Sequence, residues 1–251
     1  MALDPLRDRR LPLRHPPTAQ NPLFTTVAVL TLALGIGTNT ALFSVVNGVL
    51  LNPLPYEHPE RLVTLSSRDA DFERSSISYP NFLDWRRDNH SFAAMAAYRE
   101  ENFNLTGMGD AERLRAEMVS ATFFPILGVQ PSAGRLFTEQ EGQVGAAPVV
   151  VISEGLWKRK FASAPDAVGK PVALNGTLYT IVGVIPDGFH YQGGNFHANS
   201  EVYVPIGQWN DPLFRSRATA LGMNGVGRLK EGVTLEQANS DMSGVAAQSY
   251  R

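Results

Sequence analysis

The chain has 251 residues and an almost even charge balance, with 22 Lys and Arg against 24 Asp and Glu. This balance argues against a nucleic-acid partner, because nucleic-acid-binding domains usually carry a basic surface stripe. The sequence contains no Cys, which excludes disulfides, thiolate zinc sites and Cys nucleophiles and is compatible with an oxidising compartment.

An uncharged, apolar run covers residues 23–51. About 20 apolar residues cross the hydrocarbon core of a membrane as a helix, at about 1.5 Å per residue, so we predict a transmembrane helix over residues 21–51. The leader before it, residues 1–20, contains four arginines, whereas the stretch after it mixes Arg with acidic residues. The positive-inside bias therefore places the leader in the cytoplasm and residues 52–251 outside the membrane.

Two other interpretations of this run fit less well. A cleaved secretory signal has an apolar core of about 7–15 residues and ends at a small-residue cleavage site, but this run is longer and ends in Leu50-Leu51-Asn52-Pro53. A buried helix of a soluble protein rarely stays uncharged on every face over so many turns. We therefore expect a retained, single-pass membrane anchor.

The anchor has a face of small residues, which follow one another at spacings of three or four positions: Ala33, Gly37, Ala41, Ser44 and Gly48. Such a stripe allows a second helix to approach closely. Polar residues lie in the same run, namely Thr38, Asn39, Thr40 and Asn47. The alternative is that membrane helices are generally rich in Gly and Ala; we favour packing against partner helices.

After the anchor, strand and helix patterns mix without a regular βαβ order, which predicts an α+β domain. Strand patterns cover residues 61–67, 102–106, 112–120, 149–152, 171–174, 179–185, 201–206 and 224–229. Helix patterns begin at Ser78, around 122–127, at 154–161 and at Thr234, where Thr-Leu-Glu-Gln is a capping box. The first of these helices is expected to bury Phe82, Trp85, Phe92 and Met95 on one side.

Asn175-Gly176 separates two apolar runs and is the clearest hairpin signal in the chain. We expect the core of the domain to lie around this hairpin, Trp85 and Trp157. A fully buried Trp157 would contribute about 3–5 kcal/mol to stability relative to Ala.

The catalytic motifs in the sequence are incomplete. Ser153 lies between a strand pattern and a helix pattern, as a nucleophile elbow requires, but Val151 stands where the first Gly of that motif belongs. We therefore expect Ser153 to cap the helix. Gly35-Ile36-Gly37 resembles the start of a dinucleotide fingerprint but lies in the membrane run, and no G-x-x-x-x-G-K-[ST] loop occurs. We predict no catalytic residue and no cofactor.

His190 and His197 share a segment with Asp187 and Glu201. This set could in principle meet a metal ion, but no pair has the i, i+4 helical spacing that pre-organises ligands. We expect solvated loop residues and no metal. The Gly-, Asn- and His-rich residues 193–200 could instead form a recognition loop.

Many ordered segments resemble the MacB/FtsX-type ABC transporter permeases. They span about residues 20–245 and include 27–37, 39–47, 54–56, 59–62, 78–82, 123–129, 134–135, 155–157, 174–176, 179–189 and 228–238. Such permeases have a first span, a large periplasmic core domain of two mixed lobes, and three further spans. This chain ends before a second hydrophobic run, so it is similar to the front part of a permease.

The resemblance implies a membrane protein of the bacterial inner membrane that couples motion and breaks no bonds itself. It implies an ABC ATPase subunit on another chain, a dimer with another permease chain, contact with membrane lipid, and a periplasmic adaptor as partners. Two other function classes stay open. A membrane-anchored extracytoplasmic enzyme would need a nucleophile or metal site that the sequence lacks; a tethered ligand-binding or adaptor module would use residues 193–200.

Overall fold

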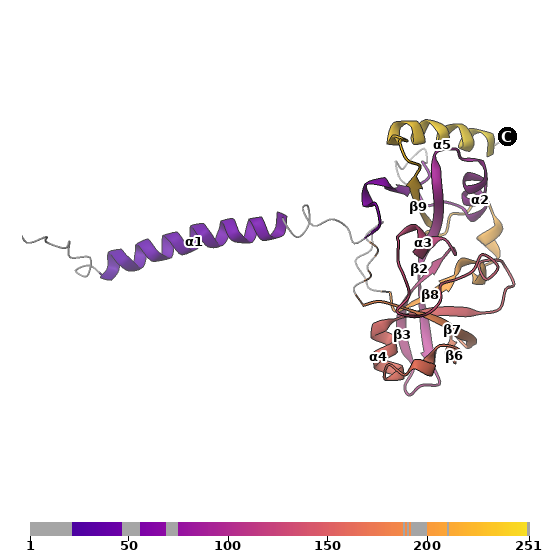
Figure 1. The fold of residues 1–251 in the computed structure, drawn as a ribbon, viewed down its shortest axis with the longest axis horizontal. Coiled ribbons are helices and arrows are strands. Elements are labelled where there is room, and N and C mark those ends of the chain that lie inside the picture. Colours follow the sequence, from indigo (N-terminus) through magenta and orange to yellow (C-terminus); the bar gives the residue numbers. More distant parts are fainter. Residues whose placement is uncertain are drawn as a thin grey trace, which may run out of the picture. The chain divides into compact units, whose positions relative to one another are not determined.

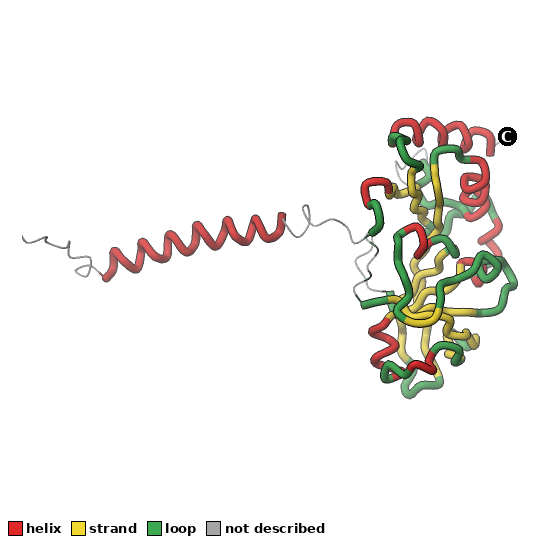
Figure 2. Tube along the Cα trace, in the orientation of Figure 1, coloured by secondary structure: helices red, strands yellow, loops and turns green. Residues whose placement is uncertain are grey.

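The computed structural model describes residues 22–46, 56–68, 75–187, 189, 191, 200–209 and 211–249. The chain divides into two compact units, Met1–Leu54 and Pro55–Arg251. The first contains one long helix, and the second contains strands and helices mixed together (Figures 1 and 2).

Helix α1, Pro22–Val46, forms the first unit. Its segment Pro22–Ser44 is long and apolar enough to cross a membrane, and no other helix of the described residues meets both conditions. The expected N-terminal apolar helix is confirmed. Its threonines are satisfied within the helix, because Thr26, Thr31 and Thr38 each donate a hydrogen bond to the carbonyl four residues earlier, at 2.8–2.9 Å.

One mixed sheet runs through the second unit and has nine strands among the described residues. Its neighbours follow the order β1 (Leu62–Leu65), β9 (Asn224–Leu229), β2 (Phe92–Thr106), β3 (Glu112–Val119), β8 (Val202–Pro205), β5 (Val149–Ser153), β7 (Thr177–Ile185) and β4 (Ala133–Gly134). Strand β6 (Pro171–Leu174) pairs with β2 and β7. The β3–β8 and β5–β7 pairs are parallel and the others antiparallel.

The helices of this unit lie at both ends of the sheet and against its middle (Figure 1). Helices α2 (Tyr79–Asp88) and α5 (Leu235–Ser249) contact each other near β9, and α4 (Glu154–Phe161) packs on β5 and β7. Helix α3 (Phe123–Ile126) lies against β2 and β9. Short 3₁₀ turns complete the unit: η2 (Pro59–Arg61), η3 (Pro165–Ala167), η4 (Ile206–Gln208) and η5 (Pro212–Arg215). The predicted mixed α/β domain is confirmed, and its described strands belong to one sheet.

Local sequence signals are confirmed where they were strongest. Asn175 and Gly176 have positive φ angles of 48° and 80°, as a two-residue hairpin turn requires. Ser153 caps α4, since its Oγ accepts a hydrogen bond from the Leu156 amide at 3.1 Å. Thr234 and Gln237 exchange the two hydrogen bonds of a capping box at 2.9 and 3.2 Å.

The prediction for the first helix was wrong about where the helix ends. It ends at Asp88, where the Asn89 side chain donates to the Trp85 carbonyl at 2.8 Å. Phe92 and Met95 instead lie on β2, which begins 10 residues before the predicted strand at 102–106. The helix-forming Ala96 and Ala97 are fully buried there, because small side chains suit a central strand that is covered on both faces. Burial in the sheet overrides the helix propensity of Ala.

The core also differs from expectation at α4. Leu156 is the fully buried residue of this helix, whereas Trp157 is half-buried and donates its Nε1 proton to the Ala164 carbonyl at 2.9 Å. We therefore no longer expect Trp157 to contribute as a fully buried side chain. Trp85 and the β7 residues Tyr179 and Ile181 are buried as predicted.

One carboxyl group lies inside the core. Glu117 of β3 is 7% exposed and lies between Glu100 of β2 and Tyr203 of β8 in the sheet register. Ser200 Oγ donates to Glu117 Oε1 at 3.1 Å, and Glu117 Oε2 has no hydrogen-bond partner among the described residues. A half-satisfied buried carboxyl is costly when it is ionised.

The surroundings of Glu117 favour its neutral form. Burial raises the pKa of Glu117 from its ordinary value near 4.5 to about 7; the Ser200 hydrogen bond opposes this rise and Glu100 adds to it. The charge of Glu117 also affects two tyrosines. Burial raises the pKa of Tyr191 and Tyr203, and a negative charge on Glu117 raises it further. The core therefore holds a carboxyl group that takes up a proton near neutral pH.

Replacing this carboxyl by an amide should remove a pH dependence of stability. In the unfolded chain Glu117 ionises near pH 4.5, whereas in the folded chain it stays protonated up to about pH 7, so folding stability falls as the pH rises through this window. One such group gives a slope of up to about 1.4 kcal/mol per pH unit. We expect Glu117→Gln to flatten this slope and to be more stable than the wild type at pH 8.

The measurement is chemical unfolding of the full chain in non-ionic detergent at pH 5 and pH 8, followed by circular dichroism. Glu231→Gln, at an exposed position, is the control and should keep the wild-type slope. An unchanged slope in Glu117→Gln would show that this carboxyl is not the group that titrates.

Candidate functional site

The segment that enters the second unit lies beside the strand that precedes its last helix. Strand β1 pairs antiparallel with β9, from Leu62 opposite Arg228 to Leu65 opposite Gly225. Because α5 follows β9, the two ends of the unit meet in one pair of strands. We call the contact of residues 56–61 with α3 and β9 the entry clamp.

Two arginines hold the entry clamp together. Arg61 donates to the Leu229 carbonyl from Nε and from its terminal nitrogen, at 2.9 and 2.6 Å. Arg228 donates to the Ile126 carbonyl from Nε and to the His58 carbonyl, both at 3.2 Å. Burial lowers the pKa of Arg228. Charged donors on backbone acceptors thus join three segments that are distant in the sequence.

Close packing supports these hydrogen bonds. Tyr56 is buried, and its ring centre lies 6.1 Å from that of Tyr191. Gly128, after α3, has a φ of +74°, and a Cβ at this position would lie 2.7 Å from Glu57 Cβ. Only glycine permits this approach. Hydrogen bonds and close packing thus hold residues 56–61 against α3 and β9.

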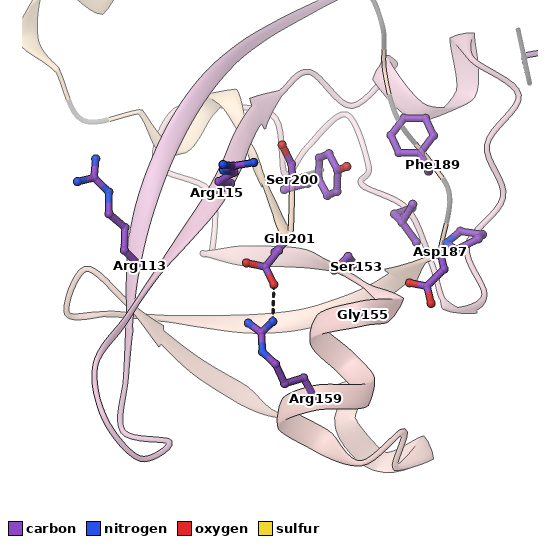
Figure 3. A pocket seen from close by; sticks show the side chains of 12 residues that line it. Arg113, Arg115, Ser153, Gly155, Arg159, Asp187, Phe189, Ser200 and Glu201 are labelled. Carbon is purple, nitrogen blue, oxygen red and sulfur yellow. Dashed lines mark hydrogen bonds and ion pairs between the residues drawn. The ribbon is translucent and has the colours of Figure 1, made fainter. Parts of the chain in front are cut away.

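A second feature is a cavity of about 400 Å³ formed by β3, β5, β8 and the start of α4 (Figure 3). We call it the α4 pocket. It is lined by Arg113, Arg115, Ser153, Gly155, Arg159, Ile185, Pro186, Asp187, Phe189, Ser200, Glu201 and Tyr203.

Ion pairs occupy one side of the α4 pocket. Arg159 bonds to Glu201 at 2.7 Å, the contact drawn in Figure 3, and it also bonds to Glu112. Lys158 bonds to Asp187 at 2.6 Å, and this hydrogen bond raises the pKa of Lys158. Both acidic residues that line the pocket are therefore neutralised by neighbouring cations.

The structure brings three of the sequence candidates to one pocket. Ser153, Asp187 and Glu201 all line the α4 pocket, but Ser153 is a helix cap and the two carboxylates are in ion pairs. His190, His197 and residues 193–199 lie outside the described residues. No group of three or more His, Asp or Glu that could hold a metal ion occurs in the described ranges.

The small-residue face of α1 is exposed along its described part, Ala33, Gly37, Ala41 and Ser44; Gly48 lies outside the described residues. A Cβ at Gly37 would meet no atom within 4 Å. The hydroxyl of Thr38 is already bonded within the helix, so this residue needs no partner helix. The helix-packing role of this face stays a prediction.

Sequence patterns missed the entry clamp and Glu117. Arg61 and Leu229 are 168 positions apart, and no local motif relates them. For Glu117 the sequence offered little signal, because the strand pattern 112–120 also contains Glu112, Arg113 and Arg115.

Comparison with known proteins identifies a family and related folds. The sequence profile of the MacB-like periplasmic core domain matches residues 25–245. No curated protein has a matching sequence.

Many solved structures share the fold, including the following three. The periplasmic region of MacB from Actinobacillus actinomycetemcomitans is 15% identical, with a TM-score of 0.56 over 75% of this chain and 83% of that one. A domain of a putative permease protein from Porphyromonas gingivalis is 16% identical, with a TM-score of 0.58 over 78% and 84%.

The extracellular domain of the noncanonic ABC-type transporter YknZ from Gram-positive bacteria is 15% identical, with a TM-score of 0.52 over 75% of this chain and 92% of that one. At these identities the structures establish a common fold. The profile match covers most of the chain, including most of α1. The chain therefore belongs to the family of MacB-like periplasmic core domains, which are parts of ABC transporter permeases.

Proposed function

We propose that this chain is the membrane-anchored permease part of an ABC-type export or mechanotransmission system and that its outer domain passes ATP-driven motion to substrates or partners. The observation that carries the proposal is the family match over residues 25–245. The matched region includes most of the apolar helix as well as the mixed domain. In this proposal α1 crosses the bacterial inner membrane, with residues 1–20 in the cytoplasm.

The entry clamp is the route of this motion. Residues 47–55 connect α1 covalently to residue 56, so a displacement of the helix is delivered to the segment that Arg61 and Arg228 tie to β9 and α3. Charge-assisted hydrogen bonds and close packing resist independent movement of these segments. Movement therefore enters the sheet at β1 and β9 and continues into β2.

The domain itself is non-catalytic in this proposal. What supports this is the match to a permease domain family; in addition, no group of three or more His, Asp or Glu that could hold a metal ion occurs among its described residues. ATP hydrolysis belongs to a separate ATPase subunit. Another permease chain, a periplasmic adaptor and membrane lipid are the other expected partners. A tethered ligand-binding module is the second candidate, and the α4 pocket favours it.

The proposal predicts both a partner and an orientation. An affinity tag after residue 251 should be labelled by a membrane-impermeant reagent in intact spheroplasts, because the domain lies outside the membrane. After cross-linking in membranes of the native host, the tagged chain should co-purify with an ABC ATPase subunit identified by mass spectrometry. Labelling that requires cell lysis, or purification without any ABC ATPase, contradicts the proposal.

The small-residue face of α1 should mediate helix packing. Gly37→Leu or Ala41→Leu fills the space that a second backbone needs, so association with a second copy or with other permease spans should fall several-fold in a membrane two-hybrid assay. Val29→Leu, at another exposed position of α1, should leave association unchanged. Equal losses from both kinds of substitution would remove this face from the account.

A further inference from the structure

Two arginines of the α4 pocket have no ion-pair partner among the residues that the structure describes. Arg113 and Arg115 are exposed and lie two residues apart on β3, so their side chains leave the same face of the strand. Burial raises the pKa of Glu100 and the charge of Arg115 counteracts this rise, yet neither arginine has an acidic partner within 4.0 Å among the described residues. Both guanidinium groups are therefore open to an outside anion.

The acidic residues of the same pocket do not cancel this charge. Asp187 is held by Lys158 at 2.6 Å, and Glu201 is held by Arg159 at 2.7 Å. Figure 3 shows Arg115 on one side of the pocket and Asp187 on the other. Asp187 is therefore separated from Arg115, whereas Glu201 lies near Arg115 and is paired with Arg159.

A hydroxyl group adds a further donor. Ser153 Oγ accepts the hydrogen bond of the Leu156 amide, so its own proton is available to a ligand in the pocket. Guanidinium groups recognise carboxylates and phosphates through paired N–H donors. The polar side of the pocket thus matches a compact oxyanion.

The remaining lining is apolar and aromatic. Ile185, Pro186, Phe189 and Tyr203 contribute to the wall, and Figure 3 shows the Phe189 ring across the pocket from Arg115. A volume of about 400 Å³ lies in the range of small-molecule sites, about 300–1,000 Å³. An inorganic anion would leave this apolar wall without a contact.

We infer that the α4 pocket binds a small organic anion, in which a carboxylate or phosphate meets Arg115, with Arg113 adding positive charge from the same strand, and a ring or short apolar group meets Phe189. This inference goes beyond the proposed permease function and does not depend on it, because a pocket on this domain can bind its ligand without an ATPase partner.

The test is isothermal titration calorimetry of the full chain in non-ionic detergent with phenyl phosphate as the probe. We expect a dissociation constant below about 1 mM, weakened about tenfold by Arg115→Gln and weakened also by Arg113→Gln and by added salt. Arg215→Gln removes an exposed arginine from η5, outside the pocket lining, and should leave binding unchanged.

Two further probes separate the polar and apolar parts of the site. Inorganic phosphate lacks the ring and benzyl alcohol lacks the charge, so each should bind at least about tenfold more weakly than phenyl phosphate. Phe189→Ala should reduce phenyl phosphate binding and leave phosphate binding unchanged. Equal binding of phosphate and phenyl phosphate, equal effects of Arg115→Gln and Arg215→Gln, or no binding of phenyl phosphate would overturn the inference.

If Arg115→Gln alters the unfolding transition, Arg113→Gln, at another exposed position of the same strand, takes its place in the comparison with Arg215→Gln. Failure of this experiment leaves the ATPase co-purification untouched, and failure of co-purification leaves the titration untouched. The two proposals are therefore distinguishable.

Discussion

The pairing of β1 with β9 is the constraint on which the rest of the domain depends. Strand β1 is an edge strand that pairs only with β9 among the described strands, and β9 in turn pairs with β2. Arg61 and Arg228 add charged donors on backbone carbonyls, each such hydrogen bond contributing about 1.5–3 kcal/mol. The first and last strands of the domain are thereby paired at one edge of the sheet, and in the proposed function movement of the anchor enters the domain there.

The sheet separates the β1–β9 pair from the α4 pocket. Between β9 and the α4 pocket lie β2 and β3, and β3 carries both the pocket arginines and the buried Glu117. Apolar clusters cover the sheet on both faces, so its central strands are held in register by packing as well as by hydrogen bonds. Ser200 lines the pocket and donates a hydrogen bond to Glu117, so the pocket wall is connected directly to this carboxyl. Among the described residues, Glu117 is the only carboxyl that is more than nine-tenths buried and lacks an ion-pair partner.

Sequence reasoning succeeded where the decisive interactions are local. The Asn175-Gly176 turn, the Ser153 cap and the Thr234 capping box each depend on residues within three positions of one another. It was wrong at β2, because Ala and Met form helices by intrinsic propensity and only the surrounding sheet makes a central strand preferable. The entry clamp could not be predicted at all, since its partners are brought together by the sheet order, and the open charge of Arg115 became visible only once the ion pairs around it were known.

The most direct test of the account is hydrogen–deuterium exchange of the full chain in membranes with its ABC ATPase, compared between the nucleotide-free state and a state trapped with a non-hydrolysable ATP analogue. The account predicts altered exchange in residues 62–65 and 224–229, and a smaller alteration in Arg228→Leu than in the control Arg215→Leu, because the former loses the donors that tie the entering segment to the sheet. Exchange in β1 and β9 that does not respond to nucleotide, or that responds equally in the two variants, would contradict it.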